Sequence, residues 1–349
     1  MSRPDLLLIS DGASPHTRRL AAGLAQRGLA VEIATFEGAG VPGVREHRLG
    51  RRPATEDLRY ALAVPALARV IAGRRPRVVH AHYVSSYGLM AALARLCLPR
   101  PPGLVQTAWG TDLLVTARRS RLRRQLAAFA LRQAALVTAD SNDLLAEVSR
   151  LAPAVPRLRM LFGPPRALFD RTRVPERLIL SVRRLDPPLR VPLVVSAFRR
   201  AREIAPDTLA GWRLVVAGTG SDEAAVRELM RGDGSIDLVG SLQQDELHAL
   251  LLRAHAFVSV PTSDGTSAAL LEAMAAGVVP VVNGLPANRE WVDDRIGLVV
   301  PRDPEEEELA HALIGAIGRE PDVAAIRARV RPAVWEEQVA ALAAAYPTQ

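Results

Sequence analysis

The sequence predicts an α/β fold with two doubly wound parallel sheets, each in its own domain. The length of 349 residues exceeds one ordinary α/β domain and suits two of roughly 170 residues each. Short apolar runs alternate twice with helical segments along the chain, and this alternation is typical of parallel sheets. A proline-rich stretch without periodicity, from Phe162 to Pro175, separates the two series and predicts a linker.

The expected strands are apolar runs of strand length. In the first half they lie near residues 6–10, 31–35, 78–81, 104–107, 136–139 and 158–161. In the second half they lie near residues 178–182, 213–217, 236–239, 256–260, 279–282 and 298–300. Strong helix formers follow at 268–276, and further helices are expected from about Ser221 or Asp222 and around Trp335 to Tyr346.

Arginine supplies all of the positive charge. Lysine and arginine together number 45 against 37 acidic residues, a net charge of +8, and no lysine occurs in the sequence. Aromatic residues make up only 4%, and no RNA-stacking motif accompanies the scattered arginines. Nucleic-acid binding is therefore not expected.

Cysteine content and hydropathy favour a cytoplasmic location. The single cysteine, Cys97, excludes an internal disulfide and a cysteine metal cluster, so a reducing compartment is expected. The chain begins with a strand-length apolar run at 5–9, without the pattern of a signal peptide. No run of about 18 uncharged apolar residues predicts a membrane span.

The loop between the expected strand at 256–260 and the helix at 268–276 carries the most specific site signal. Gly265 lets the backbone approach a ligand closely, and Thr266 or Ser267 can cap the helix. Free N–H groups and the positive end of the helix dipole would then face an anion such as a pyrophosphate. Asp264 would hold sugar hydroxyls at the mouth of this loop.

Glu272 lies about one and a half turns into the same helix, far enough to reach past a phosphate towards a ribose hydroxyl. The alternative interpretation is an ordinary capped helix that carries one solvated aspartate and one solvated glutamate. The loop taken alone leaves both interpretations open.

With its flanks, this segment resembles the nucleotide-sugar site of the retaining GT-B glycosyltransferases of family 4, the glycosyl transferases group 1. Their signature is two acids separated by seven residues, as Asp264 and Glu272 are here, with aspartate where glutamate is commoner. Glu272-Ala-Met-Ala-Ala-Gly and Pro280-Val-Val are similar to the family. Ser263-Asp-Gly-Thr and Pro286-Ala-Asn-Arg-Glu resemble one bacterial branch of it.

The resemblance covers nearly the whole chain and implies the GT-B fold, two Rossmann-like domains that face a central cleft. It implies an acceptor-binding domain at 1–165, a donor-binding domain at 175–332, and a final helix at 333–349 that packs back on the first domain. In open α/β sheets ligands bind beyond the carboxyl ends of the strands, so the motifs that follow strands are the expected site residues.

On the donor side, Arg183 and Arg184 end the expected strand at 178–182, where either can pair with a pyrophosphate through a bidentate fork. Relatives usually carry one arginine here and a lysine a few residues later. Leu189 occupies the lysine position, and the neighbouring Arg190 is the expected substitute.

Three glycines follow the next strands on the donor side. A lone Gly-x-Gly is weak evidence for a phosphate loop, so Gly218 and Gly220 either shape the site near the nucleotide base or form a purely structural turn. Gly240 ends the strand at 236–239, where family members often contact the base through backbone atoms.

On the acceptor side, motifs at 14–18, 79–83 and 107–112 each follow a strand. The resemblance places His16 under the reacting sugar and lets His82 and Asp112 orient the acceptor or the transferred sugar. Trp109 stands where many relatives carry a histidine, so no general base is assigned there. A strand-end histidine satisfied by the backbone remains the alternative for His80 and for His82.

The segment from Arg118 to Arg132 combines arginines with an apolar stripe that includes Leu122 and Leu126. Such a segment can rest on an anionic membrane surface, which would make the protein peripheral at the inner face of the membrane. The alternative is a solvated helix face over an ordinary core.

These features together predict transfer of a sugar from a nucleotide-diphosphate donor to an acceptor hydroxyl, with retention as the resemblance implies. No metal is expected, since arginine and a helix terminus would bind the diphosphate. The alternatives are a degenerate glycosyltransferase-like binding protein and another GT-B enzyme such as a sugar-nucleotide epimerase. The assignments are catalytic for Asp264, Arg183, Arg184 and His82, donor-binding for Glu272, Gly265, Thr266, Ser267, Arg190, Gly218, Gly220 and Gly240, and acceptor-side for His16, Trp109 and Asp112.

Overall fold

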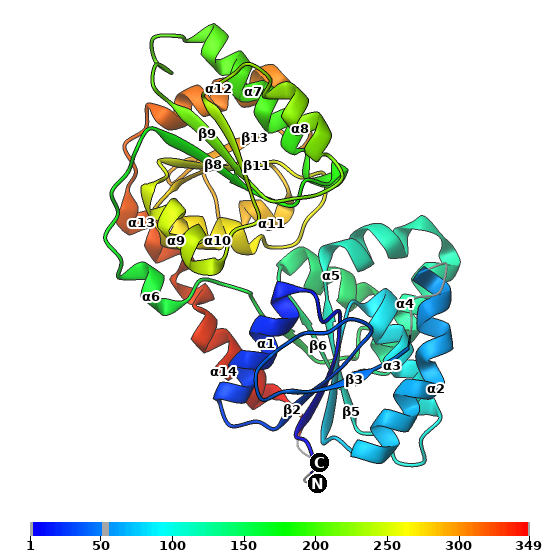
Figure 1. Cartoon of the computed structure of the whole chain (residues 1–349). Coiled ribbons are helices and arrows are strands. Elements are labelled where there is room, and N and C mark those ends of the chain that lie inside the picture. The colour runs from blue at the N-terminus through cyan, green and yellow to red at the C-terminus, as the bar shows by residue number, and fades with distance from the viewer. Residues whose placement is uncertain (1–2, 51–55, 348–349) are drawn as a thin grey trace. The chain divides into compact units, whose positions relative to one another are not determined.

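The computed structural model describes residues 3–50 and 56–347 (Figure 1). Contacts divide the chain into two compact units. Unit 1 comprises Met1–Phe162 and Glu336–Gln349, and unit 2 comprises Gly163–Trp335. The second unit is therefore continuous in sequence, whereas the first is assembled from both ends of the chain.

Unit 1 is built on a parallel sheet of seven strands. Their order across the sheet is β3-β2-β1-β4-β5-β6-β7. The strands are β1 (Leu6–Ile9), β2 (Val31–Thr35), β3 (Arg45–Arg48), β4 (Val78–His82), β5 (Gly103–Ala108), β6 (Leu136–Ala139) and β7 (Arg157–Arg159). All of their pairings are parallel, as the alternation of strands and helices predicts.

Helices cover both faces of this sheet, with α1 and α14 on one side and α2, α3 and α4 on the other (Figure 1). The helices of unit 1 are α1 (Pro15–Gln26), α2 (Glu56–Arg74), α3 (Leu89–Leu96), α4 (Arg121–Arg132), α5 (Asn142–Leu151) and α14 (Trp335–Ala345). Short π-helical turns follow β4 and β5, at Val84–Gly88 and at Thr111–Thr116.

Unit 2 has a parallel sheet of six strands in the order β10-β9-β8-β11-β12-β13. The strands are β8 (Leu178–Val182), β9 (Arg213–Ala217), β10 (Ile236–Gly240), β11 (Ala256–Ser259), β12 (Val279–Asn283) and β13 (Leu298–Val300). Every strand predicted for the second half of the sequence is present within one residue of its expected ends. The prediction of two doubly wound parallel sheets is thus confirmed.

Helices also cover both faces of the second sheet, with α7, α8 and α12 on one side and α9, α10 and α11 on the other (Figure 1). The helices of unit 2 are α6 (Arg166–Phe169), α7 (Val191–Ile204), α8 (Glu223–Leu229), α9 (Gln244–Arg253), α10 (Ala268–Ala275), α11 (Pro286–Arg289), α12 (Glu306–Ile317) and α13 (Val323–Val330). The short helix α6 lies in the stretch that the sequence predicts to be an unpatterned linker. Its residues Leu168 and Phe169 are buried, which stabilises the helical turn.

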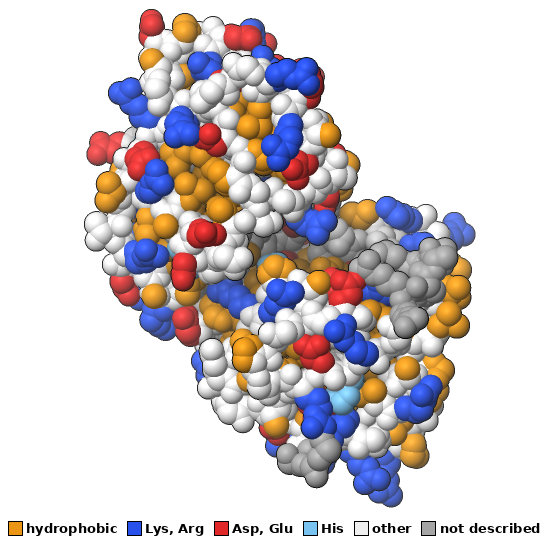
Figure 2. Space-filling view, viewed as in Figure 1, with side chains coloured by type: hydrophobic (Ala, Val, Ile, Leu, Met, Phe, Trp, Pro, Cys, Tyr) orange, Lys and Arg blue, Asp and Glu red, His pale blue; other side chains and the backbone are white. Residues whose placement is uncertain are grey.

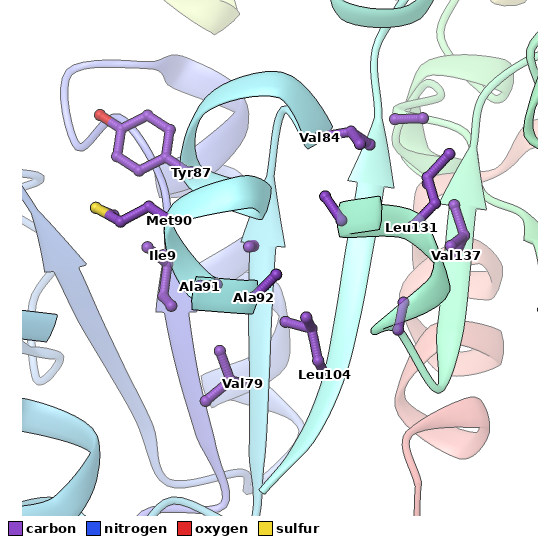
Figure 3. Close-up of a cluster of buried hydrophobic side chains, with 14 of the residues drawn as sticks. Ile9, Val79, Val84, Tyr87, Met90, Ala91, Ala92, Leu104, Leu131 and Val137 are labelled. Carbon is purple, nitrogen blue, oxygen red and sulfur yellow. The ribbon is translucent and has the colours of Figure 1, made fainter. Parts of the chain in front are cut away.

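The core of unit 1 explains why its central strands read as continuous apolar runs. Alternate residues of each strand face opposite layers of helices, so both sets are buried. Ile9, Val79 and Leu104 lie against helix α3, where Met90 and Ala91 face them (Figure 3). The small alanines of α3 allow the helix to approach the sheet closely.

Strand β3 was missed by the sequence analysis because it is polar. Its sequence is Arg-Glu-His-Arg, and it pairs at the edge of the sheet with β2. His47 Nε2 lies 2.7 Å from Glu32 Oε2, and Arg74 pairs with the same carboxylate. Burial raises the pKa of Glu32, but these two neighbours outweigh it and the pKa is lowered. The edge strand is thus held by charge pairing, and its sequence lacks the alternation of apolar and polar residues that predicts a strand.

The segment from Arg118 to Arg132 is not one helix. Residues Ala117–Arg119 form a 3₁₀ turn, and α4 begins after Ser120, whose Oγ accepts a hydrogen bond from the N–H of Arg123 at 3.2 Å. On the face of the molecule in Figure 2, the arginines are scattered among acidic side chains over both units. None of the helices described for residues 3–50 and 56–347 is long and apolar enough to cross a membrane.

Candidate functional site

The loop from β11 to α10 in unit 2 gathers three of the predicted site residues. Ser267 caps α10, with its Oγ accepting from the N–H of Leu270 at 3.3 Å. Arg183, which follows β8, donates from Nη1 to the same Oγ at 2.8 Å and forms an ion pair with Asp264. The two strand ends are neighbours because β8 pairs with β11. An arginine therefore lies at the start of a helix, where backbone N–H groups and the helix dipole also favour an anion.

The environment of Arg183 shows how firmly it is held. Only 11% of its side chain is exposed, against 28% for Asp264. Two of the guanidinium nitrogens have partners, whereas the buried Nε has no hydrogen-bond partner among the described residues. The arginine is thus oriented by the protein and retains donor capacity.

Two glycines allow the Arg183 loop to approach β9. Gly218 has φ +143°, and a Cβ atom there would lie 1.9 Å from the carbonyl oxygen of Arg183. A Cβ on Gly220 would lie 2.3 Å from the carbonyl oxygen of Leu185. Both positions require glycine for close backbone packing, so these residues shape the loop that carries Arg183. Gly240 has φ +71°, but a Cβ added there would have no atom within 4 Å, so only its backbone conformation favours glycine.

The other two predicted arginines are placed differently. Arg184 is exposed and its Nε pairs with Asp186 at 2.7 Å. Arg190 adopts a left-handed backbone with φ +50° and donates to the carbonyl oxygens of Val260 at 2.7 Å and Arg302 at 3.0 Å. Its guanidinium therefore satisfies carbonyls beyond the ends of two strands.

Glu272 is buried, with 4% of the residue exposed, so the interpretation of this acid as a solvated side chain is wrong. Gln244 on α9 donates from Nε2 to Glu272 Oε1 at 2.9 Å, and the same amide lies 2.7 Å from His248 Nε2. Since the amide has two hydrogens, it can donate to both, which leaves the proton of a neutral His248 on Nδ1. Gln244 and His248 were not predictable from the sequence, because only the packing of α9 on α10 brings them to the carboxylate.

The segment after α10 fixes the far side of the same loop. Trp291 Nε1 lies 3.4 Å from Thr266 Oγ1. The buried amide of Asn283 donates to the carbonyl oxygen of Pro261 at 2.7 Å, and Asn288 donates to Asn283 Oδ1 at 3.0 Å. The residues Pro286 to Glu290 thus support the loop through its backbone.

In unit 1 the predicted acceptor-side residues form an aromatic cluster. The ring of Trp109 lies 5.1 Å from His16, 5.8 Å from His82 and 5.1 Å from Phe162. Tyr83, which stacks on Trp109 at 5.7 Å, has φ +62° although it is not a glycine. Strained residues of this kind persist where the surrounding structure holds them, often at functional sites.

Two polar atoms of this cluster are buried without a hydrogen-bond partner in the described part of the chain, His82 Nε2 and Trp109 Nε1. Burial, and next the neighbouring His80 and His16, hold the pKa of His82 well below its ordinary value, so its ring is neutral at pH 7. Burial lowers the pKa of His80 to about 3, and that ring is satisfied by Tyr346 at 2.9 Å and Thr107 at 2.8 Å. The alternative of a satisfied strand-end histidine therefore holds for His80.

Asp112 joins the turns that follow β4 and β5. Its Oδ2 accepts from the N–H of Val84 at 2.6 Å, and its Oδ1 accepts from the N–H of Trp109 at 3.0 Å. Burial raises the pKa of Asp112 to about 7, and these backbone hydrogen bonds oppose the rise. The carboxyl thus positions Trp109 through the backbone.

Among residues 3–50 and 56–347, no three histidine, cysteine, aspartate or glutamate side chains gather in a way that could hold a metal ion. The charged side chains around the β11–α10 loop include Arg183 with its partner Asp264, Arg190 on the carbonyl oxygen of Val260, and the buried Glu272.

Comparison with known proteins assigns each unit to a family. Residues 5–141 match the model of the glycosyl transferase 4-like family, and residues 176–318 match that of the glycosyl transferases group 1. The chain is 27% identical over 277 residues to the GDP-mannose:cellobiosyl-diphosphopolyprenol alpha-mannosyltransferase of Xanthomonas campestris. The aligned residues cover 75% of this chain and 68% of the relative.

Solved structures share the fold. Sucrose-phosphate synthase from Thermosynechococcus elongatus matches with a TM-score of 0.78 at 20% identity, over 99% of this chain and 98% of the other. Anabaena HepE in complex with UDP-glucose matches with a TM-score of 0.76 at 14% identity, over 97% and 99%. With both units matched by glycosyltransferase families and the fold shared with these structures, the chain belongs to the GT-B glycosyltransferases.

Proposed function

We propose that the protein transfers a sugar from a nucleotide-diphosphate donor, bound by unit 2, to an acceptor hydroxyl bound by unit 1. The observation that carries the proposal is the arrangement around α10. Arg183 donates to the cap residue Ser267, where we assign the anion site, and the buried Glu272 lies five residues after Ser267. At a rise of about 1.5 Å per residue this offset is roughly 7.5 Å, which suits a diphosphate followed by a ribose.

The roles follow from this offset. The bond between the anomeric carbon and the diphosphate oxygen breaks, the acceptor oxygen takes its place, and the departing diphosphate takes up the proton of the hydroxyl. Arg183 and the N–H groups at the start of α10 stabilise the charge that develops on the diphosphate. Glu272 accepts hydrogen bonds from the ribose hydroxyls.

Asp264 serves both the arginine and the sugar in this proposal. Its Oδ2 holds Arg183, and its Oδ1 is assigned to the hydroxyls of the transferred sugar. Retention of the anomeric configuration is inferred from the spacing of Asp264 and Glu272, which resembles that of the retaining family. No metal is needed for these roles, since arginine and helix N–H groups supply the positive charge.

Arg184 and Arg190 contribute less directly. The exposed Arg184 can reach a diphosphate only by releasing Asp186, and Arg190 supports the loop through the carbonyl oxygens that it holds. In unit 1, neutral His82 and Trp109 carry the unpartnered polar atoms that suit the acceptor or sugar hydroxyls.

The relatives bear on the substrates only in part. The Xanthomonas campestris relative uses GDP-mannose and a diphosphopolyprenol-linked disaccharide, and the Anabaena structure holds UDP-glucose. We propose a role in the synthesis of cell-surface polysaccharide, glycolipid or a glycosylated natural product.

Calorimetric titration with UDP, GDP and ADP, and then with their sugar conjugates, tests the donor site. We expect micromolar binding of one nucleotide and a loss of roughly 10- to 150-fold in Glu272→Gln, the range for removing a hydrogen bond to a charged group. Asp245→Asn, an exposed acid on α9, is the matched control and should bind normally. The configuration of the new linkage, read by NMR from a turned-over sugar conjugate, tests retention.

A degenerate binding protein is the second candidate. Arg190 lies beside the position where relatives carry a lysine, and its guanidinium is engaged by carbonyl oxygens and Asp303. Nucleotide binding without sugar transfer to any of a panel of glycan and lipid-linked acceptors favours this candidate. Turnover that is lost in both Asp264→Ala and Glu272→Ala rejects it.

A further inference from the structure

A cavity of about 550 Å³ lies in unit 1, between α2, α3, α4 and the turns after β4 and β5. This size falls within the range of roughly 300 to 1,000 Å³ that is usual for ligand pockets. The strand-end turns supply polar residues to its wall, among them Ser85, Ser86 and Thr111. Helices α3 and α4 supply apolar ones, among them Leu93, Leu122 and Leu126.

The apolar wall remains partly open to solvent. Leu122 is 65% exposed and Leu126 is 39% exposed, and they lie one helical turn apart on α4. Leu89 and Leu93 have the same spacing on α3. Two leucine pairs on neighbouring helices thus form an open apolar wall rather than a closed core, and binding an apolar chain there would remove this surface from water.

Two arginines, Arg119 and Arg123, line the same cavity. Arg119 lies in the 3₁₀ turn before α4 and Arg123 lies in its first turn, so both basic side chains line the cavity beside Leu122 and Leu126. Arginine binds phosphate oxygens through its planar fork, and a guanidinium beside an apolar wall is suited to a ligand that is anionic at one point and apolar beyond it.

Two other arginines of the segment pair with a buried acid. Glu147 on α5 is buried, and it pairs with Arg118 at 3.7 Å, with Arg124 at 3.1 Å and with Arg150. Arg118 and Arg124 therefore anchor the segment to α5. Arg119 and Arg123 line the cavity.

We propose that this cavity binds the phosphate-bearing apolar chain of a lipid-linked acceptor. The apolar chain lies against the leucines of α3 and α4, and the phosphate or diphosphate pairs with Arg119 and Arg123. The polar turns after β4 and β5 then face the sugar end of the acceptor, beside Asp112. The inference deepens the proposed function and rests on it, since the ligand is the acceptor of that transfer.

Binding of farnesyl diphosphate to the full-length protein, measured by calorimetry, tests the proposal. Farnesol and inorganic diphosphate serve as probes of the chain alone and the anion alone. We expect farnesyl diphosphate to bind at least about tenfold more tightly than either fragment, because only the intact molecule fills both parts of the cavity. Equal affinity for the intact probe and one fragment overturns the proposal.

Matched variants locate the binding. Arg119→Ala and Leu122→Ser should each weaken farnesyl diphosphate binding by about tenfold, the usual effect of losing a charged hydrogen bond or a buried leucine. Arg121→Ala removes an exposed arginine of α4 outside the cavity, and Leu96→Ser removes a leucine of α3 that is 63% exposed, close to the 65% of Leu122. Both controls should stay within about twofold of the unsubstituted protein, and an equal loss in a control and its partner contradicts the assignment.

Vesicles distinguish an acceptor pocket from adhesion to a membrane surface. The proposal is overturned in favour of surface attraction if phosphatidylglycerol vesicles bind as strongly as farnesyl diphosphate and if Leu122→Ser and Leu96→Ser weaken vesicle binding equally. Glu272→Gln lies in unit 2 and should leave farnesyl diphosphate binding unchanged. Nucleotide binding without farnesyl diphosphate binding rejects the acceptor pocket alone, whereas the reverse result rejects the donor site alone.

Discussion

Replacement of Gly218 by alanine tests whether the Gly-x-Gly turn is needed to place Arg183. A Cβ at position 218 would lie 1.9 Å from the carbonyl oxygen of Arg183, where ordinary contacts begin at 3.4 Å. The two strand ends must therefore separate by about 1.5 Å to relieve the overlap. The backbone of Gly218, with φ +143°, is also unfavourable for alanine.

Both effects add to the expected loss of stability. Backbone strain contributes on the order of 1–3 kcal/mol, and a small-to-large change in a packed site contributes roughly a further 1–3 kcal/mol. We therefore expect Gly218→Ala to lower the free energy of unfolding by about 4 kcal/mol. Displacement of Arg183 should also weaken nucleotide binding by at least about tenfold, since an oriented arginine loses its charged hydrogen bond.

Gly232→Ala separates backbone strain from overlap. Gly232 has φ +75° but no atom within 4 Å of the added Cβ, so only the strain of about 1–2 kcal/mol applies. Urea denaturation of both variants gives the free energies, and calorimetry gives the nucleotide affinities. If Gly218→Ala is no more destabilising than Gly232→Ala, the close approach of the two strand ends is not what requires glycine, and the reasoning is refuted.

Three further predictions concern unit 1. Burial raises the pKa of Asp112 to about 7 from the ordinary 3.8. Between these two values the folded state binds a proton that the unfolded state does not. The stabilisation by this group is therefore full below about pH 4 and is lost as the pH rises through about 7. Urea denaturation between about pH 5 and pH 8 should show a fall in stability from this group, and Asp112→Asn should remove that part of the slope; an unchanged slope contradicts the raised pKa. The ring resonances of His82 should not titrate between about pH 6 and pH 8 in NMR spectra, since burial lowers its pKa, and a midpoint near 6.5 rejects the buried neutral ring. Glu147→Gln should lower the free energy of unfolding by about 2 kcal/mol in thermal or urea denaturation, because a carboxylate that is 2% exposed loses its ion pairs with arginines that are about half exposed. Glu223→Gln removes an ion pair nearer the surface and should change the free energy of unfolding by less than about 0.5 kcal/mol.

The strands were predictable wherever burial alone determined them. Continuous apolar runs such as 178–182 mark strands that are covered on both faces, and the sequence analysis located these well. β3 was not predictable, because its stability comes from the ion pairs of Glu32 with His47 and Arg74, and Arg74 is distant in sequence. Pairing across such separations leaves no periodic signal along the chain.

The site was predictable as a set of loops but not as a set of contacts. The positions of Arg183, Asp264 and Ser267 after two strands and before a helix were enough to bring them together, because neighbouring parallel strands end at the same edge. The partners of Glu272 depend on how α9 packs against α10, and the carbonyl contacts of Arg190 depend on its left-handed backbone. Neither property follows from spacing.

The assembly of unit 1 from both ends of the chain has a consequence for synthesis on the ribosome. Gln338 accepts from the N–H of Leu161 at 2.9 Å, and the hydroxyl of Tyr346 lies 2.9 Å from Nδ1 of the buried His80. During translation these partners emerge only after all of unit 2 has been made, whereas unit 2 is complete as soon as Trp335 has left the exit tunnel. Most of unit 1 is therefore made first, yet unit 1 finishes folding last. Until the last residues emerge, Nδ1 of His80 lacks its partner Tyr346, and the face of the sheet that α14 covers stays exposed.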